Sequence, residues 1–420
     1  MDTRILDPET QFSAWTKALQ EKRLPAAIVD LNAFDHNIKK IADSVAETTK
    51  TIRIATKSIR VPELIKRVLD KGPPFKGVMC YSVEEAEYLY SLHIDDFLIA
   101  YPSVQKSDLS ILRKMTDAGA TVALVLDSKE QMQTIAHHLT EMDSDEKSHH
   151  APLRIVLDID MAYQLLWTKL GPLRTPVWSE QDIRDVLVAA KQYSSLKIVG
   201  AMAYEAVIAG LPDSNPFTWF LNPIKYWIRR IAVPDIATRR ATIPEVFKSE
   251  GFAMDIFNGG GTGSLDSAVK ETALSEVTVG SGLLCPHLYD YYSNLNKMPC
   301  FTFEPAAFFA LQATRYPNQY TVTCAGGGYI ASGETGADRS PIAVYPPGLS
   351  PVSAEGYGEV QTPLVAKDPA KRPILGQAVF FRHAKAGELA EHFNDYQLSD
   401  NGELKGVAKT YRGLGLSFLG

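Results

Sequence analysis

The sequence predicts an α/β protein: a (β/α)8 barrel, the TIM-barrel architecture, followed by a C-terminal antiparallel β domain. Three observations support this prediction. Short runs rich in β-branched residues alternate with amphipathic stretches, the alternation repeats eight times, and the pattern changes after about residue 295. Alternating strands and helices require a parallel sheet, and eight units in roughly 230 residues have the size of a closed barrel. A doubly wound open sheet is the alternative arrangement.

Each expected barrel strand is a short apolar run, and the segments between these runs place apolar residues three or four positions apart, as amphipathic helices do. The expected strands are 52–57, 75–82, 96–102, 121–127, 153–160, 197–205, 254–261 and 276–282. The clearest helical segments are 61–72, 83–93, 106–119, 128–139 and 180–193. A further strand, 26–31, precedes Asn32, an N-cap residue type, and a helix to about Glu47. That leading strand can join the C-terminal sheet.

The chain is too long for a single core, so more than one domain is expected. We expect an N-terminal segment at 1–25 that associates with the β domain, a barrel over 26–295 and a β domain over 296–420. After residue 295 the strands are short and broken by glycine and proline, as in QYTVTCAGGGYIASG and PIAVYPPGL. Short strands separated by glycine and proline are typical of antiparallel sheets.

The charge balance argues against a nucleic-acid partner. The chain has 43 Lys+Arg against 49 Asp+Glu and a formal net charge of -6, so the basic surface that nucleic acids require is not expected. The N-terminal residues MDTRILDPET lack the basic start and apolar core of a signal peptide. We therefore expect a cytoplasmic protein.

The most apolar stretch, 217–233, contains Pro223, Lys225, Arg229 and Arg230, so it cannot span a bilayer. We expect an amphipathic helix that packs on its own domain or on a partner subunit, and no membrane partner. A helix lying on a membrane surface is the alternative, because Trp and Arg are interleaved in this stretch.

Two glycine-rich loops follow the last two expected barrel strands. Active sites of such barrels lie at the carboxyl ends of the strands, often with a phosphate site after strands seven and eight. Strand seven runs into 258–264 and strand eight into 280–282. Glycine backbones let several N–H groups converge on an anion. The expected phosphate-binding residues are Gly260, Gly261, Thr262, Gly263, Gly280 and Ser281. Neither loop matches the triphosphatase P-loop, which favours a small cofactor. Simple tight turns are the alternative.

Lys57 ends the first expected strand and so lies at the same rim of the barrel. A lysine opposite a phosphate site is the arrangement that anchors pyridoxal phosphate, because the amine bonds to the aldehyde while the loops hold the phosphate. An ordinary solvated lysine is the alternative interpretation.

Together these residues resemble the fold-type III pyridoxal-phosphate enzymes. The similarity is to the branch with D-threonine aldolase and D-serine dehydratase, distant relatives of alanine racemase, and within it to a bacterial amino-acid deaminase/aldolase subgroup. It is carried by AAIVDLNAFDHNI (26–38), RIATKSIR (53–60) and FNGGGTGS (257–264). The resemblance implies that Lys57 holds pyridoxal 5'-phosphate, although the Pro and His residues usual beside this lysine are absent.

The same resemblance implies that Arg174 and Tyr204 flank the cofactor ring, and that the protein is a homodimer. A surface arginine and a core tyrosine are the alternative readings. The resemblance also implies a divalent metal (Mn, Mg or Zn) held by His383 and by a second ligand two residues later. That position is Lys385, and a protonated lysine does not bind hard metals. Either Glu388 supplies the missing oxygen, or the ammonium of Lys385 replaces the metal charge, which we favour.

Catalysis would need an acid–base group facing Lys57, and His383 is the first candidate, with Tyr204 sharing the role. A structural histidine within a strand is the alternative. The resemblance implies a lyase acting on small D-3-hydroxy amino acids, preferably by retro-aldol cleavage to glycine and an aldehyde. D-serine dehydratase-type β-elimination is the main alternative, followed by racemisation. A non-catalytic carrier of the cofactor is a further alternative, against which the long C-terminal region argues.

Overall fold

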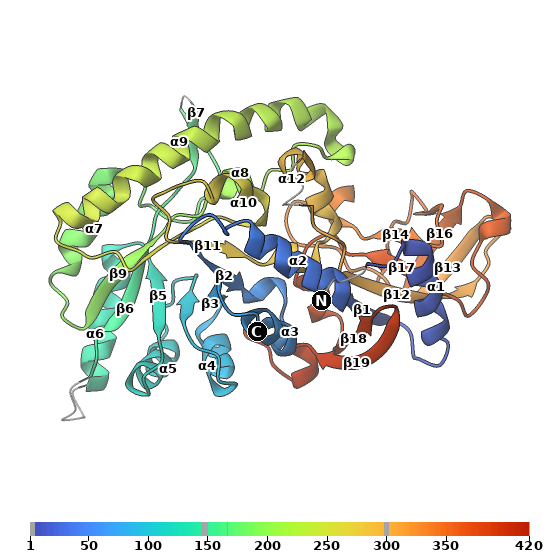
Figure 1. The fold of residues 1–420 in the computed structure, drawn as a ribbon, viewed down its shortest axis with the longest axis horizontal. Coiled ribbons are helices and arrows are strands. Elements are labelled where there is room, and N and C mark those ends of the chain that lie inside the picture. Colours follow the sequence, from blue (N-terminus) through green and yellow to red (C-terminus); the bar gives the residue numbers. More distant parts are fainter. Residues whose placement is uncertain (1–4, 144–149, 166, 298–301, 420) are drawn as a thin grey trace.

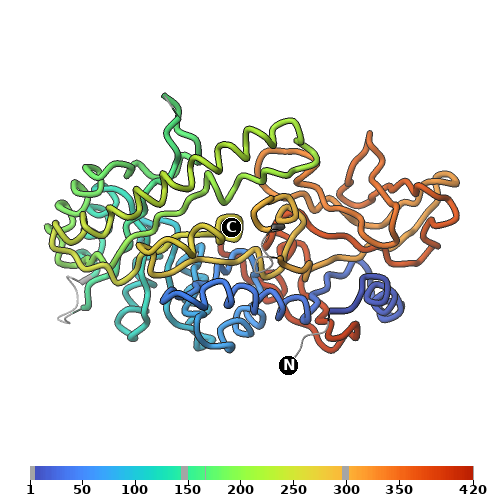
Figure 2. Tube along the Cα trace, turned by 45° about the horizontal axis from the view of Figure 1, so that its top comes forward, coloured from blue at the N-terminus to red at the C-terminus, as the bar shows by residue number. Residues whose placement is uncertain are grey.

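The structure is a computed structural model that describes residues 5–143, 150–165, 167–297 and 302–419. It consists of a closed parallel barrel and a nine-stranded sheet, which lie side by side (Figures 1 and 2). The predicted fold class is therefore confirmed. Within the described residues, no helix combines the length and the apolar character needed to cross a membrane.

The barrel closes where β11 pairs in parallel with β2. Its strands are β2 (Thr51–Ala55), β3 (Phe75–Cys80), β4 (Phe97–Ile99), β5 (Val122–Leu126), β6 (Leu153–Asp158), β9 (Leu196–Met202), β10 (Ile256–Gly259) and β11 (Glu276–Val279). Each corresponds to one of the eight predicted strands, and only β2 and β9 begin one residue earlier than predicted. All five residues of β5 are buried, as expected of strands covered on both faces. The open sheet is excluded.

Helices surround the barrel strands as the apolar spacing predicts. They are α3 (Pro62–Leu69), α4 (Val83–Ser91), α5 (Lys106–Asp117), α6 (Lys129–Asp143) and α7 (Glu180–Ala190). Ser82 caps α4 through the amide of Glu85, and Ser179 forms a capping box with Asp182 at the start of α7. Short helices α8 (Ala206–Ala209), α10 (Leu265–Ala268), α11 (Ser281–Leu284) and α12 (Ser293–Lys297) follow later strands.

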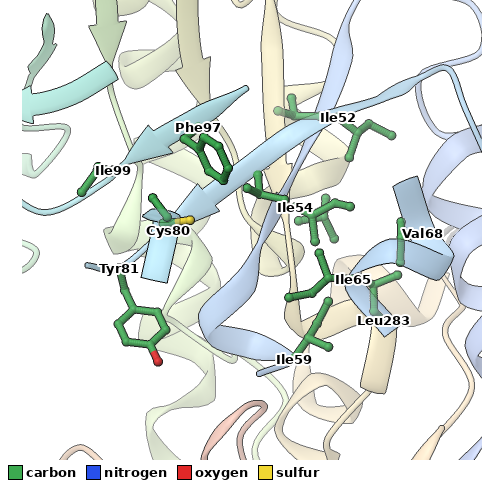
Figure 3. Packing of buried hydrophobic residues seen from close by; sticks show 14 of the residues in the cluster. Ile52, Ile54, Ile59, Ile65, Val68, Cys80, Tyr81, Phe97, Ile99 and Leu283 are labelled. Atoms are coloured by element: carbon green, nitrogen blue, oxygen red, sulfur yellow. The ribbon is translucent and has the colours of Figure 1, made fainter. Parts of the chain in front are cut away.

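The core of the barrel extends beneath the segment that carries Lys57. Figure 3 shows Ile54 of β2, Ile59 and Leu283 of α11, which belong to one buried cluster with exposures of 1%, 0% and 1%. Ile54 precedes Lys57 and Ile59 follows it. Because both ends of this segment are buried in the core, the lysine is held at a defined place on the rim.

Two features between barrel strands were not predicted. A short hairpin of β7 (Tyr163–Leu165) and β8 (Thr168–Leu170) follows β6. The helix expected over 217–233 is a 3-10 turn, η2 (Pro216–Leu221), followed by α9 (Asn222–Ser249), which runs along the outside of the barrel (Figure 1). The sequence prediction ends too early because α9 continues through two internal prolines, which normally interrupt helices.

The sheet of the β domain is mainly antiparallel. Its strands are β1 (Ala26–Asp30), β12 (Ala307–Arg315), β13 (Thr321–Ala325), β14 (Ile342–Tyr345), β15 (Leu349–Pro351), β16 (Gln361–Ala366), β17 (Ala378–Arg382), β18 (Asp395–Asp400) and β19 (Glu403–Lys409). β1 lies between β12, to which it is antiparallel, and β18, to which it is parallel. By pairing, β1 therefore belongs to the sheet, whereas the expected division began the barrel at residue 26.

The N-terminal helix α1 (Pro8–Ala18) covers one face of this sheet. Its Phe12 and Trp15 pack with Ile28, Phe308 and Phe380 in a separate apolar cluster. The helix α2 (Leu31–Asp43) then leads from β1 to the first barrel strand. The buried side chain of its Asn37 donates to the carbonyls of Leu283 in α11 and of Glu304 before β12, and it accepts from the amide of Glu304. The N-terminal region therefore joins the sheet and the barrel.

Candidate active site

A cavity of about 460 Å³ lies at the carboxyl ends of the barrel strands. Its lining contains most of the residues that the sequence singled out: Lys57, Arg174, Tyr204, Gly260, Gly261, Thr262, Gly280 and Ser281. Gly263, His383 and Glu388 are not part of the lining. The structure thus brings the lysine, the two glycine loops and the two ring-flanking candidates to one place.

Lys57 lies in a 3-10 turn, η1 (Thr56–Ser58), directly after β2. Its Nζ donates a hydrogen bond of 2.8 Å to the hydroxyl of Tyr101. The backbone carbonyl of Lys57 accepts from Arg60 Nε at 3.0 Å, and Arg60 forms an ion pair with Glu391 of the β domain. Gly387 touches the same carbonyl, because a Cβ there would lie 1.9 Å from the oxygen. The β domain therefore helps to fix the lysine turn.

The buried carboxylate of Glu205 binds the first glycine loop. Gly260 has a φ of +80°, a conformation that favours glycine. Its amide donates to Glu205 Oε2 at 3.1 Å, and Ser264 Oγ donates to Glu205 Oε1 at 2.6 Å. Gly261 in turn leaves room for Tyr204, whose Cε2 would lie 2.9 Å from an added Cβ. Sequence reasoning had not identified Glu205, which directly follows Tyr204.

The two loops meet at the starts of two short helices. Thr262 begins η3 (Thr262–Ser264) and Ser281 begins α11, and the first amides of helices lack intrahelical acceptors. Gly282 N donates to Thr262 Oγ1 at 3.0 Å, which joins the loops. Within the described residues, the amides of Thr262, Gly263 and Ser281 have no protein acceptor. These amides can bind an anion.

Helix α9 supplies arginines that hold the loops at the cavity. Arg240, with no exposed surface, donates to Glu205 and, at 2.7 Å, to Glu271. Arg229 Nη2 donates to the carbonyl of Gly263 at 3.2 Å, and Arg239 Nη2 to that of Asp160 at 2.6 Å. The adjacent arginines Arg239 and Arg240 can be seen in the sequence. The strand ends that they contact cannot, because these lie far away along the chain.

Arg174 and Tyr204 approach the cavity from different loops. Tyr204 follows β9, and burial together with nearby Tyr289 and Glu205 raises the pKa of its phenol. Arg174 lies in the exposed segment after the β7–β8 hairpin. Their position at one cavity agrees with the expected contacts to a cofactor ring, and these roles stay predictions.

Three carboxylates that were not predicted also line the cavity, those of Asp127, Asp158 and Asp160. Asp127 follows β5 and Asp158 ends β6. Burial and the nearby Asp127 raise the pKa of Asp158 from 3.8 to about 7. Burial also raises the pKa of Asp127. Near neutral pH this pair can therefore hold a proton inside the cavity.

His383 is not brought to the cavity. It follows β17, its exposure is 2%, and its carbonyl accepts from the amide of His287 at 3.1 Å. Neither ring nitrogen has a hydrogen-bond partner among the described residues, and burial lowers the pKa of the imidazole to about 3. The side chain lies in the packed layer between the sheet and η4 (His287–Tyr291). Its predicted acid–base role therefore has no support from the arrangement of the site.

The expected metal ligands are not assembled either. Glu388 accepts from the amide of Ser332 at 3.0 Å, and Lys385 Nζ donates to Ser332 Oγ at 3.0 Å. The unpaired imidazole of His383 could serve as one ligand, but a protein metal site needs several. Among the described residues, no group of three or more His, Cys, Asp or Glu side chains is placed to hold a metal. These residues do not fit the predicted metal site.

Comparison with known proteins identifies the barrel. Residues 29–222 match the family model "Alanine racemase, N-terminal domain". This match covers a little less than half of the chain. A 3-hydroxy-D-aspartate aldolase from Paracoccus denitrificans (strain Pd 1222) is 23% identical over 261 residues, which are 62% of this chain and 60% of the relative. A D-threonine aldolase from Arthrobacter sp is 20% identical over 257 residues, 61% of this chain and 60% of the relative. These alignments span less than two thirds of the relatives' length.

The alanine racemase-type fold extends over nearly the whole chain. The crystal structure of D-threonine aldolase from Filomicrobium marinum has a TM-score of 0.78 and 19% identity, and the match covers 94% of this chain and 97% of that one. D-threo-3-hydroxyaspartate dehydratase from Delftia sp. HT23 has a TM-score of 0.72 and 16% identity, with 94% and 98% covered. At these identities the similarity establishes the fold of both domains.

The cavity of this alanine racemase-type barrel fits pyridoxal 5'-phosphate. The cofactor needs a lysine amine for its aldehyde and hydrogen-bond donors for its phosphate. Lys57 supplies the amine, and the free amides of Thr262, Gly263 and Ser281 lie at the two glycine loops. The expected cofactor therefore agrees with the residues present, unlike the expected metal.

Proposed function

We propose that this protein is a pyridoxal-phosphate-dependent lyase that cleaves D-3-hydroxy amino acids into glycine and an aldehyde. The observation that carries the proposal is that Lys57 lines one cavity together with Thr262 and Ser281, whose amides are free among the described residues. The names of the relatives, 3-hydroxy-D-aspartate aldolase and D-threonine aldolase, support aldol cleavage of this substrate class.

When bound, pyridoxal phosphate supplies an electron sink that stabilises negative charge at the α-carbon of an amino acid. The residues of this chain have separate tasks around it. Lys57 provides the amine, and Thr262, Gly263 and Ser281 bind the phosphate. Arg174, at the exposed side of the cavity, is suited to bind the substrate carboxylate because guanidinium groups pair with carboxylates.

Aldol cleavage also requires a group that accepts the proton of the β-hydroxyl. Among the cavity residues, Asp158 is suited to this task because its pKa of about 7 lets it exchange a proton near neutral pH. Tyr204 lines the same cavity, but its raised pKa keeps it protonated. It would therefore act as a donor. We assign the acceptor role to Asp158 in place of His383.

Product analysis tests the reaction. Purified protein loaded with cofactor is incubated with D-threonine, 3-hydroxy-D-aspartate, D-serine and D-alanine, each with and without manganese or EDTA. We expect glycine and aldehyde in equal amounts from the first two substrates, with Lys57→Ala as the inactive control. EDTA is expected to leave the rate unchanged, because the described residues assemble no metal site. Keto acid from D-serine would instead identify a dehydratase, L-isomers a racemase, and unchanged substrates a carrier.

We also propose that the protein acts as a cytoplasmic homodimer. The apolar stretch predicted to pack on its own domain or on a partner subunit is exposed in the single chain: Trp219 is 71%, Phe220 62%, Ile224 58% and Trp227 50% exposed. Contiguous exposed aromatic side chains are typical of protein interfaces rather than of free surfaces. A second copy of the chain would cover them.

A further inference from the structure

Tyr101 is the residue whose side chain contacts the amine of Lys57. It lies in the loop that follows β4 and lines the cavity. Its hydroxyl is 2.8 Å from Lys57 Nζ, and Nζ is 5.4 Å from the centre of the Tyr101 ring. The ring is 41% exposed, so the pair lies at the open side of the cavity, within reach of an entering molecule.

The surroundings of Tyr101 favour its ionised form. Partial burial opposes ionisation of the phenol, but the charges of Lys57, Arg174 and Lys385 outweigh it, so that the pKa of Tyr101 is lowered. Tyr204 lines the same cavity, and the nearby Tyr101 contributes to the raised pKa of Tyr204. Arg174 comes from the barrel and Lys385 from the β domain, so the positive charge around this phenol exists only when both parts of the chain are in place.

This placement matters for the chemistry of Lys57. An ammonium group has no lone pair, so the lysine must lose a proton before its nitrogen can bond to a carbonyl carbon. This step therefore needs a proton acceptor close to the nitrogen. A phenolate at hydrogen-bond distance is a base that can accept this proton directly.

We propose that Tyr101 is the acid–base partner of Lys57. One proton passes from Nζ to the phenolate oxygen, which frees the nitrogen lone pair to form a C–N bond with an aldehyde. The carbonyl oxygen leaves as water, and no electrons are gained or lost overall. When the amine of a substrate later takes the place of the lysine nitrogen on this carbon, its N–H proton passes to the leaving lysine nitrogen, and the phenol returns the other proton to the free lysine amine. The inference rests on the proposed function, because the aldehyde is that of the cofactor, and it assigns a residue that the sequence did not single out.

The first test uses cofactor-free protein and measures phenolate absorbance in the ultraviolet as the pH is raised. The wild-type minus Tyr101→Phe difference should titrate below a free tyrosine amide. In a Lys57→Met background the same difference should shift to higher pH, because the nearest cation is gone. A Tyr101 midpoint equal to that of the free amide, or unaffected by Lys57→Met, would overturn the proposal.

The second test measures how fast pyridoxal phosphate attaches covalently to the protein, followed by borohydride reduction and identification of the modified lysine by mass spectrometry. Near neutral pH, Tyr101→Phe should react about 100-fold more slowly than wild type, the usual range for loss of a general base. The two rates should converge at alkaline pH. Tyr320→Phe is the matched control, since Tyr320 is 45% exposed and lies in the β domain, and its rate should equal that of wild type.

The two proposals fail in different ways. If wild-type protein forms no adduct at Lys57, the cofactor assignment and thus the proposed function fail. If the adduct forms at Lys57 and Tyr101→Phe reproduces the wild-type rate at every pH, the function stands and the role of Tyr101 is refuted. Thermal unfolding of each variant, followed by circular dichroism, confirms that the compared proteins are folded.

Discussion

At the scale of single residues, Glu205 links the binding loop to the scaffold. Its carboxylate accepts hydrogen bonds from Gly260 and Ser264 of the loop, and from Arg240 of α9. Glu205 is 1% and Arg240 0% exposed, so each charge depends on the other for compensation. The position of the amides that we propose to bind the phosphate therefore depends on an ion pair outside the cavity.

Arg240→Met is expected to destabilise the protein by about 3–5 kcal/mol, because it leaves Glu205 buried without its partner. It should also weaken cofactor binding, since the glycine loop loses its support. Urea unfolding and a fluorescence titration with pyridoxal phosphate measure the two effects. Arg184→Met is the control, because the ion pair of Arg184 with Glu250 lies at the surface and should contribute less than about 1 kcal/mol.

The pKa of Asp158 predicts how stability depends on pH. Because the pKa rises from 3.8 in the unfolded chain to about 7 in the folded protein, the folded state holds a proton that the unfolded state has lost. The free energy of unfolding should therefore fall as the pH rises from about 4 to about 7. Buried Glu85, with a pKa raised to about 7, acts in the same direction. Urea midpoints across this range should show a smaller decline for Asp158→Asn. An identical decline would contradict the assignment.

At the scale of elements, the loop after β17 presses on the turn that carries Lys57. Gly387 has a φ of +84°, and a Cβ there would meet the Lys57 carbonyl oxygen at 1.9 Å. This contact, like the Arg60–Glu391 ion pair, connects a β-domain loop to the first barrel strand. The lysine is thus positioned from outside the barrel as well as from within it.

Gly387→Ala should displace the Lys57 turn and slow the attachment of pyridoxal phosphate by at least about tenfold, as expected when a reacting group is misplaced. The control is Gly376→Ala. Gly376 has a φ of +90° with no atom within 4 Å of an added Cβ, so it reproduces the backbone strain of roughly 1–2 kcal/mol without the clash. Equal attachment rates for the two variants would show that the loop does not position the lysine.

At the scale of the whole molecule, the exposed aromatic face of η2 and α9 predicts the state of assembly. Trp219→Ser with Trp227→Ser should shift the protein from dimer to monomer in sedimentation velocity, because large apolar contacts are lost. Val188→Ser is the control: Val188 is also exposed, at 48%, but lies on α7 away from this stretch. A wild-type protein that sediments as a monomer would refute the homodimer.

Prediction from sequence succeeded where the information is local. The eight barrel strands are apolar runs whose pattern survives in the structure, and the glycine loops follow the strands that the barrel rule requires. Lys57 lies at the cavity because it belongs to the turn that follows β2, and its role stays a prediction. His383 also follows a strand, β17, yet it is buried beside η4, where its carbonyl accepts from the amide of His287. Residue spacing cannot distinguish these two cases, because the direction of a side chain after a strand end depends on what the strand packs against.

The amino-acid sequence by itself determined the alternation of strands and helices, the glycine loops and the lysine at the rim, since each depends on neighbouring residues and backbone preferences. Only the tertiary structure decided which side chains meet: Tyr101 with Lys57, Glu205 with Arg240, and Asp127 with Asp158. These partners are separated by 31 to 44 positions. Closure of the barrel and docking of α9 bring these partners together. Burial then strengthens the electrostatic interactions between them.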